Sequence, residues 1–336
     1  MSMSIFAQDY VEQPRVVREL LDHAEEIRSK ASFYKPKNVL ILGMGASYYS
    51  GLYATVYASN FGLNCRCEEL SEVLWYWDEK CFDFYDLFVF VSQSGETVEL
   101  KKFLENWSKL KKKSILVTNN PNSSVAKFLG MDAVFLIHAG QERAMGSTKT
   151  FTNSIVTLLL IFSKWLDRKL DLAGIDEHLE YVLQLDLQNY IETANVSHQL
   201  ILVGRGFTVP ILRMAQLTLA EVARYNCSWY SGGGFRHGAM ELLVSGAMTT
   251  LVHLRGKTER ITEKMFRELC RFDKTWLITN VEMDAQRKIS LKAGLSEEIA
   301  PIPCIVVFQR LANELAQKRG YPSGVGMIAS KVTSEE

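Results

Sequence analysis

The chain has 336 residues, of which 47% are hydrophobic, so it can form about two domains that each bury a core. Its 38 basic and 38 acidic side chains give a formal net charge of zero, which argues against binding nucleic acid through a general positive excess. The basic run at residues 109–113 is interpreted as a solvated helix end. The longest apolar stretch, residues 155–162, is far below the roughly 18 residues of a membrane span, and no signal peptide is recognisable. We therefore expect a cytoplasmic protein without nucleic-acid or membrane partners.

The six cysteines lack the paired spacing of a metal site. Cys65 and Cys67 alternate along a predicted strand, which places both thiols on one face but supplies no second pair. We expect free structural thiols in a reducing compartment, and no bound metal or organic cofactor.

Apolar residues recur at helical spacing over residues 14–31, which predicts a leading amphipathic helix. Residues 38–43 follow as an apolar run that ends in glycine, typical of a strand buried on both faces of a parallel sheet. Strands and helices then alternate, which implies βαβ units with right-handed crossovers. The expected helices are residues 48–61, 97–110 and 148–170, and the expected strands are residues 87–91, 114–118 and 133–137.

The same order of elements begins again at residues 199–206, where a strand runs into Gly204-Arg205-Gly206 as the first runs into Gly43-Met44-Gly45. Further strands are expected at residues 249–254, 275–279 and 302–308, with a helix at 309–318. We infer an internal duplication in an α/β protein with two three-layer lobes, each a mostly parallel sheet flanked by helices. The expected parts are a helical segment (1–35), a first lobe (36–170), a second lobe (195–320) and a tail that contributes to the site (321–336).

The strongest chemical signal follows the predicted strand at residues 87–91. Ser92, Gln93, Ser94 and Thr97 surround a glycine there, directly before a helix. Ligands of open α/β sheets bind at the carboxyl ends of the strands, and a helix N-terminus offers free N–H groups to a phosphate. A helix cap would need one hydroxyl rather than three around a glycine. The sequence therefore predicts a phosphate cradle.

The segment after the first strand, Gly43-Met44-Gly45-Ala46-Ser47, sits in the matching position. A dinucleotide site would want glycine or alanine where Tyr48 stands, so nicotinamide binding is disfavoured. Ser47 instead is expected to be one more donor for the ligand.

Five motifs occur in order, and together they resemble one family. They are Gly45-Ala46-Ser47-Tyr48-Tyr49-Ser50-Gly51, residues 92–97, Ser147-Thr148-Lys149-Thr150-Phe151-Thr152, Gly204-Arg205-Gly206 and His237-Gly238. The set is similar to the sugar-isomerase (SIS) family, in particular to the isomerase half of glucosamine-6-phosphate synthase and its stand-alone deaminase and deglycase relatives. The resemblance covers nearly the whole chain, from Glu12 to Thr333.

The resemblance implies roles for particular residues. Glu221 matches the carboxylate that moves a proton between C1 and C2 of the sugar, and His237 matches the histidine that opens the ring, typically from the neighbouring subunit. Lys331 matches a lysine that handles the sugar carbonyl, once several extra residues before it are allowed for. Sugar-phosphate contacts are implied for Ser47, Ser92, Gln93, Ser94 and Thr97, and a sugar pocket for Met145, Gly146 and Ser147. A homodimer with the site near its interface is also implied.

Physical chemistry makes these roles sensible. A carboxylate suits the transfer of a carbon-bound proton, and an imidazole suits ring opening near neutral pH. His237 is expected in a glycine-rich turn, residues 232–238, that permits close approach of a ligand. Without the resemblance, Glu221 would be interpreted as an ordinary helix-surface carboxylate and Lys331 as a solvated charge.

Three positions depart from the family pattern: Gly234 replaces a glutamate, Ala239 a proline and Thr218 a lysine. The isomerase-like sequence also starts almost at Met1, so we expect no glutamine-hydrolysing half and no built-in ammonia source. The first hypothesis is an isomerase or deaminase of an amino-sugar phosphate of the glucosamine 6-phosphate type. The alternatives are a fructosamine-6-phosphate deglycase and a phosphosugar-binding regulator without turnover.

Overall fold

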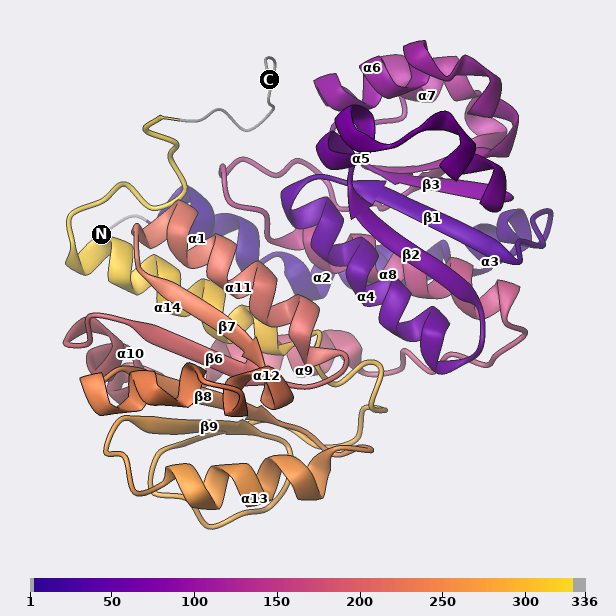
Figure 1. Ribbon diagram of the computed structural model, residues 1–336. Helices are drawn as coiled ribbons and strands as arrows, with labels where there is room; N and C mark the ends of the chain where they lie inside the picture. The colour runs from indigo at the N-terminus through magenta and orange to yellow at the C-terminus, as the bar shows by residue number, and fades with distance from the viewer. Residues whose placement is uncertain (1–2, 329–336) are drawn as a thin grey trace. The chain divides into compact units, whose positions relative to one another are not determined.

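The computed structural model describes residues 3–328, whose elements divide into two compact units (Figure 1). Unit 1 takes in the chain up to Pro14, Ala144–Gly146 and Leu172–Val325, and unit 2 takes in Arg15–Arg143, Ser147–Asp171 and the described residues from Gly326 on. The domain boundaries expected from the sequence stay predictions.

Unit 2 is built on a parallel sheet of five strands in the order β2-β1-β3-β4-β5. The strands β1, β3 and β4 are almost wholly buried, as their unbroken apolar sequences require. Helices α4 and α8 cover one face of the sheet, and α5, α6 and α7 cover the other (Figure 1). The strands are β1 (Asn38–Gly43), β2 (Asn64–Glu69), β3 (Leu87–Val91), β4 (Ser114–Thr118) and β5 (Val134–Leu136). The helices are α2 (Gln13–Asp22), α3 (Ala24–Ala31), α4 (Gly45–Asn60), α5 (Leu70–Tyr76), α6 (Val98–Asn106), α7 (Ser124–Leu129) and α8 (Lys149–Trp165), with 3₁₀ turns η1 (Glu79–Phe84), η2 (Ser108–Lys113) and η3 (Met131–Ala133).

Unit 1 holds a second parallel sheet of five strands, in the order β10-β9-β8-β6-β7. Helices α11 and α14 lie on one face and α13 on the other (Figure 1). The strands are β6 (Leu200–Gly204), β7 (Cys227–Ser231), β8 (Met248–His253), β9 (Thr275–Thr279) and β10 (Lys288–Ser290). The helices are α1 (Ile5–Tyr10), α9 (Ile175–Gln184), α10 (Gln188–Asn195), α11 (Thr208–Ala223), α12 (Gly232–Arg236), α13 (Glu259–Leu269) and α14 (Cys304–Lys318), with one 3₁₀ turn η4 (Ala239–Ser245).

The two sheets repeat one topology. Read from the other edge, the second sheet runs β7-β6-β8-β9-β10, which matches β2-β1-β3-β4-β5 strand for strand. The predicted α/β fold with two duplicated lobes is therefore confirmed. In each sheet the strand order reverses beside the first strand of the lobe, between β1 and β3 and between β6 and β8, and such switch points are where open α/β sheets bind ligands.

Some predicted elements differ from the observed ones. The strand predicted at residues 302–308 is wrong, because Cys304–Lys318 form one helix, α14, whose first turns are buried all round. The leading helix is broken at His23 into α2 and α3. The glycine-rich turn before His237 contains a short helix, α12.

The thiols behave as expected from the sequence. All six cysteines are free, and Cys65 and Cys67 both face helix α4, where Cys65 Sγ lies 3.6 Å from Thr55 Oγ1 and Cys67 Sγ donates to the carbonyl oxygen of Tyr48. Burial raises the pKa of the Cys65 thiol to about 12. Across the described residues 3–328, no helix combines the length and apolarity that crossing a bilayer would require.

Candidate functional site

The first candidate loop follows β3 in unit 2. Strands β1 and β3 are neighbours in the sheet, with Gly43 paired to Val91 at their carboxyl ends. Ser47 lies in the first turn of the helix that follows β1, α4, and Ser92 lies in the loop after β3, so both predicted donors follow the strands at the switch point. This is the edge at which the sequence predicted a phosphate site.

Thr97 occupies the N-cap of α6, yet its hydroxyl does not cap that helix. It lies instead 2.8 Å from Ser92 Oγ, and the two hydroxyls share a hydrogen bond. Ser92 Oγ also accepts the N–H of Gly95 (3.1 Å), and Ser94 Oγ accepts the N–H of Glu96 (3.1 Å). The first N–H groups of α6 therefore have no side-chain cap, which leaves them available to an anion.

The rest of the loop is held by its backbone. The carbonyl oxygen of Gln93 accepts Thr118 Oγ1 and the N–H of Asn119, at 3.2 and 3.1 Å. Gly95 adopts φ +62°, and a Cβ there would stand 2.3 Å from Ser123 Oγ. Only glycine fits this position, so the hydroxyls are mounted on a rigid turn.

The one acidic side chain of the loop is turned aside. Glu96 pairs with Lys101 at 2.5 Å and accepts the N–H and Oγ of Ser124 at 2.6 and 2.8 Å. The hydrogen bonds from Lys101 and from the Ser124 N–H lower the pKa of Glu96 to about 2. The negative charge of Glu96 is therefore compensated by Lys101 on α6 and by Ser124 at the start of α7.

Helix α4 supplies a second uncapped N-terminus. It begins at Gly45 directly after β1, and its N-cap residue Met44 makes no side-chain cap bond. Ser47 lies half-buried in the first turn of α4. The switch point is thus flanked by β1 and β3, and each of these strands is followed by an uncapped helix N-terminus. Ser47 follows β1 and Ser92 follows β3.

Glu142 is a buried carboxylate beside the predicted pocket residue Ser147, and the sequence analysis did not single it out. It is buried in unit 2, where Oε1 accepts the N–H and Oγ1 of Thr148 at 2.7 and 2.9 Å, and Oε2 accepts Ser147 Oγ at 3.2 Å and Thr150 Oγ1. The carboxylate thereby neutralises the N-terminus of α8 and fixes the hydroxyl of Ser147. A glutamate shortly before a Ser-Thr-x-Thr helix start is the signal that could have indicated it.

Three other predicted site residues, Glu221, Met145 and Gly146, lie close together in unit 1. Glu221 lies half-buried on α11, and a Cβ built on Gly146 would stand 3.5 Å from its Oε2. The same Cβ would stand 3.0 Å from Val222 and 3.1 Å from Phe6, so the Gly146 backbone packs directly against α11 and α1. Met145, the preceding residue, donates its N–H to the carbonyl oxygen of Gly324 at 2.8 Å.

His237 lies elsewhere in unit 1. It is exposed at the C-cap of α12, whose N-cap residue Ser231 accepts the N–H of Gly234 at 3.0 Å. Lys331 falls outside the described residues. Within residues 3–328, no group of three or more His, Cys, Asp or Glu side chains is placed to hold a metal ion.

Comparisons with known proteins show what this chain is similar to. Residues 32–164 match the family described as SIS domain. The chain is 27% identical over 350 residues to the isomerizing glutamine–fructose-6-phosphate aminotransferase of Pyrobaculum aerophilum, covering 95% of this chain and 57% of that protein. The chain thus spans about half the length of the curated relatives it matches.

Two solved structures share the fold. The C-terminal domain of glucosamine–fructose-6-phosphate aminotransferase from Francisella tularensis superposes with a TM-score of 0.81 at 25% identity, covering 95% of this chain and 97% of that one. Glucosamine-6-phosphate deaminase from Thermotoga maritima superposes with a TM-score of 0.68 at 18% identity, covering 94% of this chain and 98% of that one, and shows the fold alone.

Residues 32–164 are a SIS domain. The resemblance predicted from the sequence, to the isomerase half of these aminotransferases, is confirmed. The matched residues include the predicted cradle residues Ser47, Ser92, Gln93, Ser94 and Thr97, and the predicted pocket residues Met145, Gly146 and Ser147.

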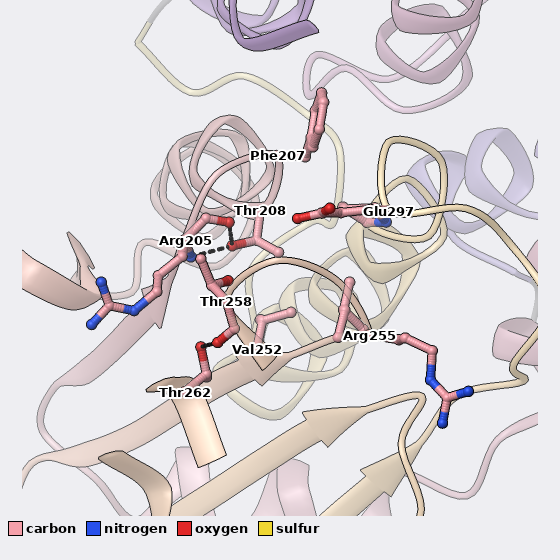
Figure 2. Close-up of a pocket in the computed structure, with 10 residues that line it drawn as sticks. Arg205, Phe207, Thr208, Val252, Arg255, Thr258, Thr262 and Glu297 are labelled. Atoms are coloured by element: carbon pink, nitrogen blue, oxygen red, sulfur yellow. Dashed lines mark hydrogen bonds between the residues drawn. The ribbon is translucent and has the colours of Figure 1, made fainter. Parts of the chain in front are cut away.

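The second sheet has a switch-point crevice of its own, which Figure 2 shows. Its volume is about 20 Å³, room for about one water. Glu297 also lines it, accepting the Lys257 N–H at 3.1 Å and lying against Gly256. The side chains of Arg205 and Arg255 point in opposite directions there (Figure 2). This crevice already contains a carboxylate and is too small for a sugar phosphate.

Proposed function

We propose that the chain is a phosphosugar isomerase that acts on an amino-sugar phosphate of the glucosamine 6-phosphate type and can release its amine. The observation that carries the proposal is the Thr97 hydroxyl, which is turned from the helix it could cap to Ser92. A hydroxyl pair of this kind, at an uncapped helix N-terminus in a SIS domain, is suited to a sugar phosphate.

The cradle would hold the phosphate through neutral donors. The hydroxyls of Ser47, Ser92, Ser94 and Thr97 and the first N–H groups of α4 and α6 can donate to phosphate oxygens. Glu96 does not oppose the anion, because Lys101 and Ser124 compensate its charge. Gln93, held through its backbone carbonyl, is proposed to add an amide donor.

Glu221 would do the proton transfer. In the open-chain sugar its carboxylate takes the proton from C2, and returning that proton to C1 interconverts aldose and ketose. With an amine on C2 the same transfer leaves an imine, which water hydrolyses to fructose 6-phosphate and ammonia. The position of Gly146 supports this role: even a Cβ added there would stand 3.5 Å from Glu221 Oε2, so the glycine leaves room beside the carboxylate. His237 is proposed to open the ring.

Lys331 is proposed to act on the sugar carbonyl. Its support is the resemblance alone, because Lys331 lies outside the described residues 3–328. Partner chains, a homodimer and a cytoplasmic location remain predictions from the resemblance.

A deglycase of fructosamine 6-phosphates is the second candidate. Its support is the segment at residues 231–238, which resembles the deglycase relatives and forms a capped helix that ends at the exposed His237. A regulator without turnover is the third candidate. Its support is Thr218, which replaces a family lysine and is fully buried one helical turn before Glu221.

One experiment separates the three candidates. The purified protein and its Glu221→Gln variant are incubated with glucosamine 6-phosphate or fructoselysine 6-phosphate and followed by proton NMR. Fructose 6-phosphate and ammonia from the first substrate, lost in the variant, are the expected result. Glucose 6-phosphate and lysine from the second would move the assignment to a deglycase. Binding of both sugars without turnover would overturn the enzyme assignment in favour of a regulator.

A further inference from the structure

Two imidazole rings stack on each other in unit 2. The rings of His23 and His138 lie parallel, with their centres 3.8 Å apart and their planes 4° from each other. His23 stands at the break between α2 and α3, and His138 follows β5 at the carboxyl edge of the sheet. The stack therefore ties the leading helices to residues 137–141, which we call the β5 loop.

The backbone of His138 needs support from its surroundings. Its φ is +47°, in the left-handed region that residues other than glycine seldom occupy, and such a conformation persists only where neighbouring groups enforce it. The buried amide of Asn153 on α8 donates to the carbonyl oxygen of Val16 on α2 at 3.0 Å. The same amide donates to that of Ile137 at 2.8 Å and to that of His138 at 3.4 Å. These bonds hold the backbone of the β5 loop, and the stack holds the His138 side chain.

Asn119 connects the β5 loop to the predicted phosphate cradle. Its Oδ1 accepts the Ala139 N–H at 3.0 Å, and its Nδ2 donates to the carbonyl oxygen of Gly140 at 2.6 Å. The N–H of Asn119 donates in turn to the carbonyl oxygen of Gln93 at 3.1 Å. A movement of the β5 loop therefore reaches Asn119 through its side chain and the cradle through its backbone.

The charges that act on His138, among the residues that the structure describes, come from His23 and from Glu26 on α3. Glu26 Oε2 lies 3.2 Å from His23 Nδ1. Helix α8 and the loop after β4 present uncharged amides to the β5 loop instead, those of Asn153 and Asn119. Burial lowers the pKa of His138 below its ordinary value of 6.5, the charge of His23 lowers this pKa further, and Glu26 raises it. A hollow of about 340 Å³ beside His138 gives water and protons access to the ring.

A lowered pKa means that the folded chain favours the neutral form of the His138 imidazole. The stack therefore contributes its full stability above about pH 6.5, where His138 is neutral in the folded and the unfolded chain alike. As the pH falls from 6.5 towards the folded pKa, this contribution is lost, because the unfolded chain takes up the proton more readily. Two imidazolium rings stacked face to face also repel each other.

We propose that His23 and His138 form an acid-sensitive latch on the β5 loop. The stacked neutral rings hold the loop closed, and protonation of both rings releases it. The released loop disturbs Asn119 and Gln93, so sugar phosphate binds more weakly in acid. Only this last step rests on the proposed function, because the opening of the latch needs no ligand.

Two variants separate the charge of the latch from its shape. His23→Phe keeps a flat ring over His138 that cannot be protonated, so the latch should stay closed at every pH. His138→Asn keeps a residue that tolerates a positive φ but removes the second ring, so the latch should be weak at every pH. His198→Gln, which removes an exposed histidine between α10 and β6, is the control. If His138→Asn does not fold, the comparison of the wild type with His23→Phe decides alone.

The first readout is hydrogen exchange of the Ala139 and Asn119 amides without ligand. It is expressed as a protection factor, so that the intrinsic pH dependence of exchange cancels. Between about pH 7.5 and about pH 5, protection should fall about tenfold or more in the wild type and in His198→Gln. It should stay constant in His23→Phe and be low throughout in His138→Asn. The same pH dependence in the wild type and in His23→Phe, or none in either, would overturn the latch.

The second readout is the Kd for glucosamine 6-phosphate, measured by calorimetry at the same two pH values. The phosphate of the ligand itself titrates near about pH 6, so each variant is compared with the wild type at one pH. The Kd of the wild type should equal that of His23→Phe at about pH 7.5 and exceed it about fivefold or more at about pH 5. Equal Kd values at both pH values, with exchange altered as expected, would overturn the step from the latch to the cradle. No binding at all at about pH 7.5, with exchange altered as expected, would instead overturn the proposed function and leave the latch standing.

Discussion

The hydroxyl of Thr97 lies 2.8 Å from that of Ser92, although Thr97 occupies the N-cap of α6. Threonine at an N-cap usually accepts an N–H bond from its own helix. Here that bond is not formed, and the hydroxyl bonds instead to the buried Ser92. The exchange makes sense if an external anion takes the place of the missing cap.

The first prediction concerns this hydroxyl. Thr97→Val keeps the shape of the side chain and removes the oxygen, so the helix should remain and sugar-phosphate binding should weaken. A lost hydrogen bond to a charged group costs about 1.5–3 kcal/mol, which corresponds to a rise in Kd of roughly tenfold or more. The Kd of each protein is measured by calorimetric titration with glucosamine 6-phosphate.

A true capping residue in the same unit is the control. Asp78 Oδ1 accepts the Lys80 N–H at 2.9 Å at the start of η1. Asp78→Ala removes that cap and should leave the Kd unchanged. Equal binding by wild type and Thr97→Val would show that the hydroxyl is not part of a phosphate site.

The second prediction concerns Gly95. Gly95→Ala places a methyl group 2.3 Å from Ser123 Oγ and 2.7 Å from Ser123 Cβ, in a backbone conformation that alanine disfavours. A non-glycine residue at positive φ alone costs about 1–3 kcal/mol, and the conflict adds to this. We expect a lower free energy of unfolding and weaker sugar-phosphate binding.

Gly62 is the control that separates the effect of backbone strain from that of the steric conflict with Ser123. Its φ is +85°, and a Cβ there meets nothing within 4 Å. Gly62→Ala should therefore lose less stability than Gly95→Ala in urea unfolding and should bind sugar phosphate normally. If the two alanine variants were equally stable and bound sugar phosphate equally well, the tight packing of the loop against Ser123 would contribute neither to stability nor to binding.

The sequence predicted the parts of the fold that depend on local pattern. The strands β1, β3 and β4 are unbroken apolar runs bounded by turn residues, and their predicted bounds agree with the structure. Residues 302–308 show the limit of this approach. They are an apolar, β-branched run as well, but they lie in and before α14, and a helix buried on all sides has the same pattern as a buried strand.

The site was predictable only in part, for a related reason. Hydroxyls around Gly95 are adjacent in the chain, so their cluster can be recognised from sequence. Glu221 and Gly146 are far apart in the chain, and only the packing of the Gly146 segment against α1 and α11 brings them close together. Edge strand β7 was missed because its residues are only partly buried and its pattern is mixed.

The third prediction concerns pH. The pKa of Glu96 is lowered from its ordinary value of 4.5 to about 2 by Lys101 and Ser124. A carboxyl with a depressed pKa in the folded state stabilises the fold above its unfolded pKa, and this contribution is lost as pH falls through the folded pKa. Glu96 should therefore stabilise the protein above about pH 4.5, and this effect should disappear between about pH 4.5 and pH 2.

Glu96→Gln tests the assignment. Its free energy of unfolding, compared with that of the wild type from pH 7 to pH 2, should be lower at pH 7 and converge with the wild type at the acid end. Because the pair is partly exposed, high salt should shrink the difference. A difference that stays constant over the whole range would exclude titration of Glu96 as its source.

The fourth prediction is the number of sugar phosphates bound by each chain. The two lobes share one topology, so a duplicated protein could bind one ligand at each switch point. The crevice of the second lobe, however, has a volume of about 20 Å³, room for about one water, which is too small for a sugar phosphate. Calorimetry should therefore give one site per chain. In Thr97→Val the whole isotherm should weaken, because no second site remains to bind at the original affinity. A component of unchanged affinity in that variant would show instead that the second lobe opens in solution and binds the ligand.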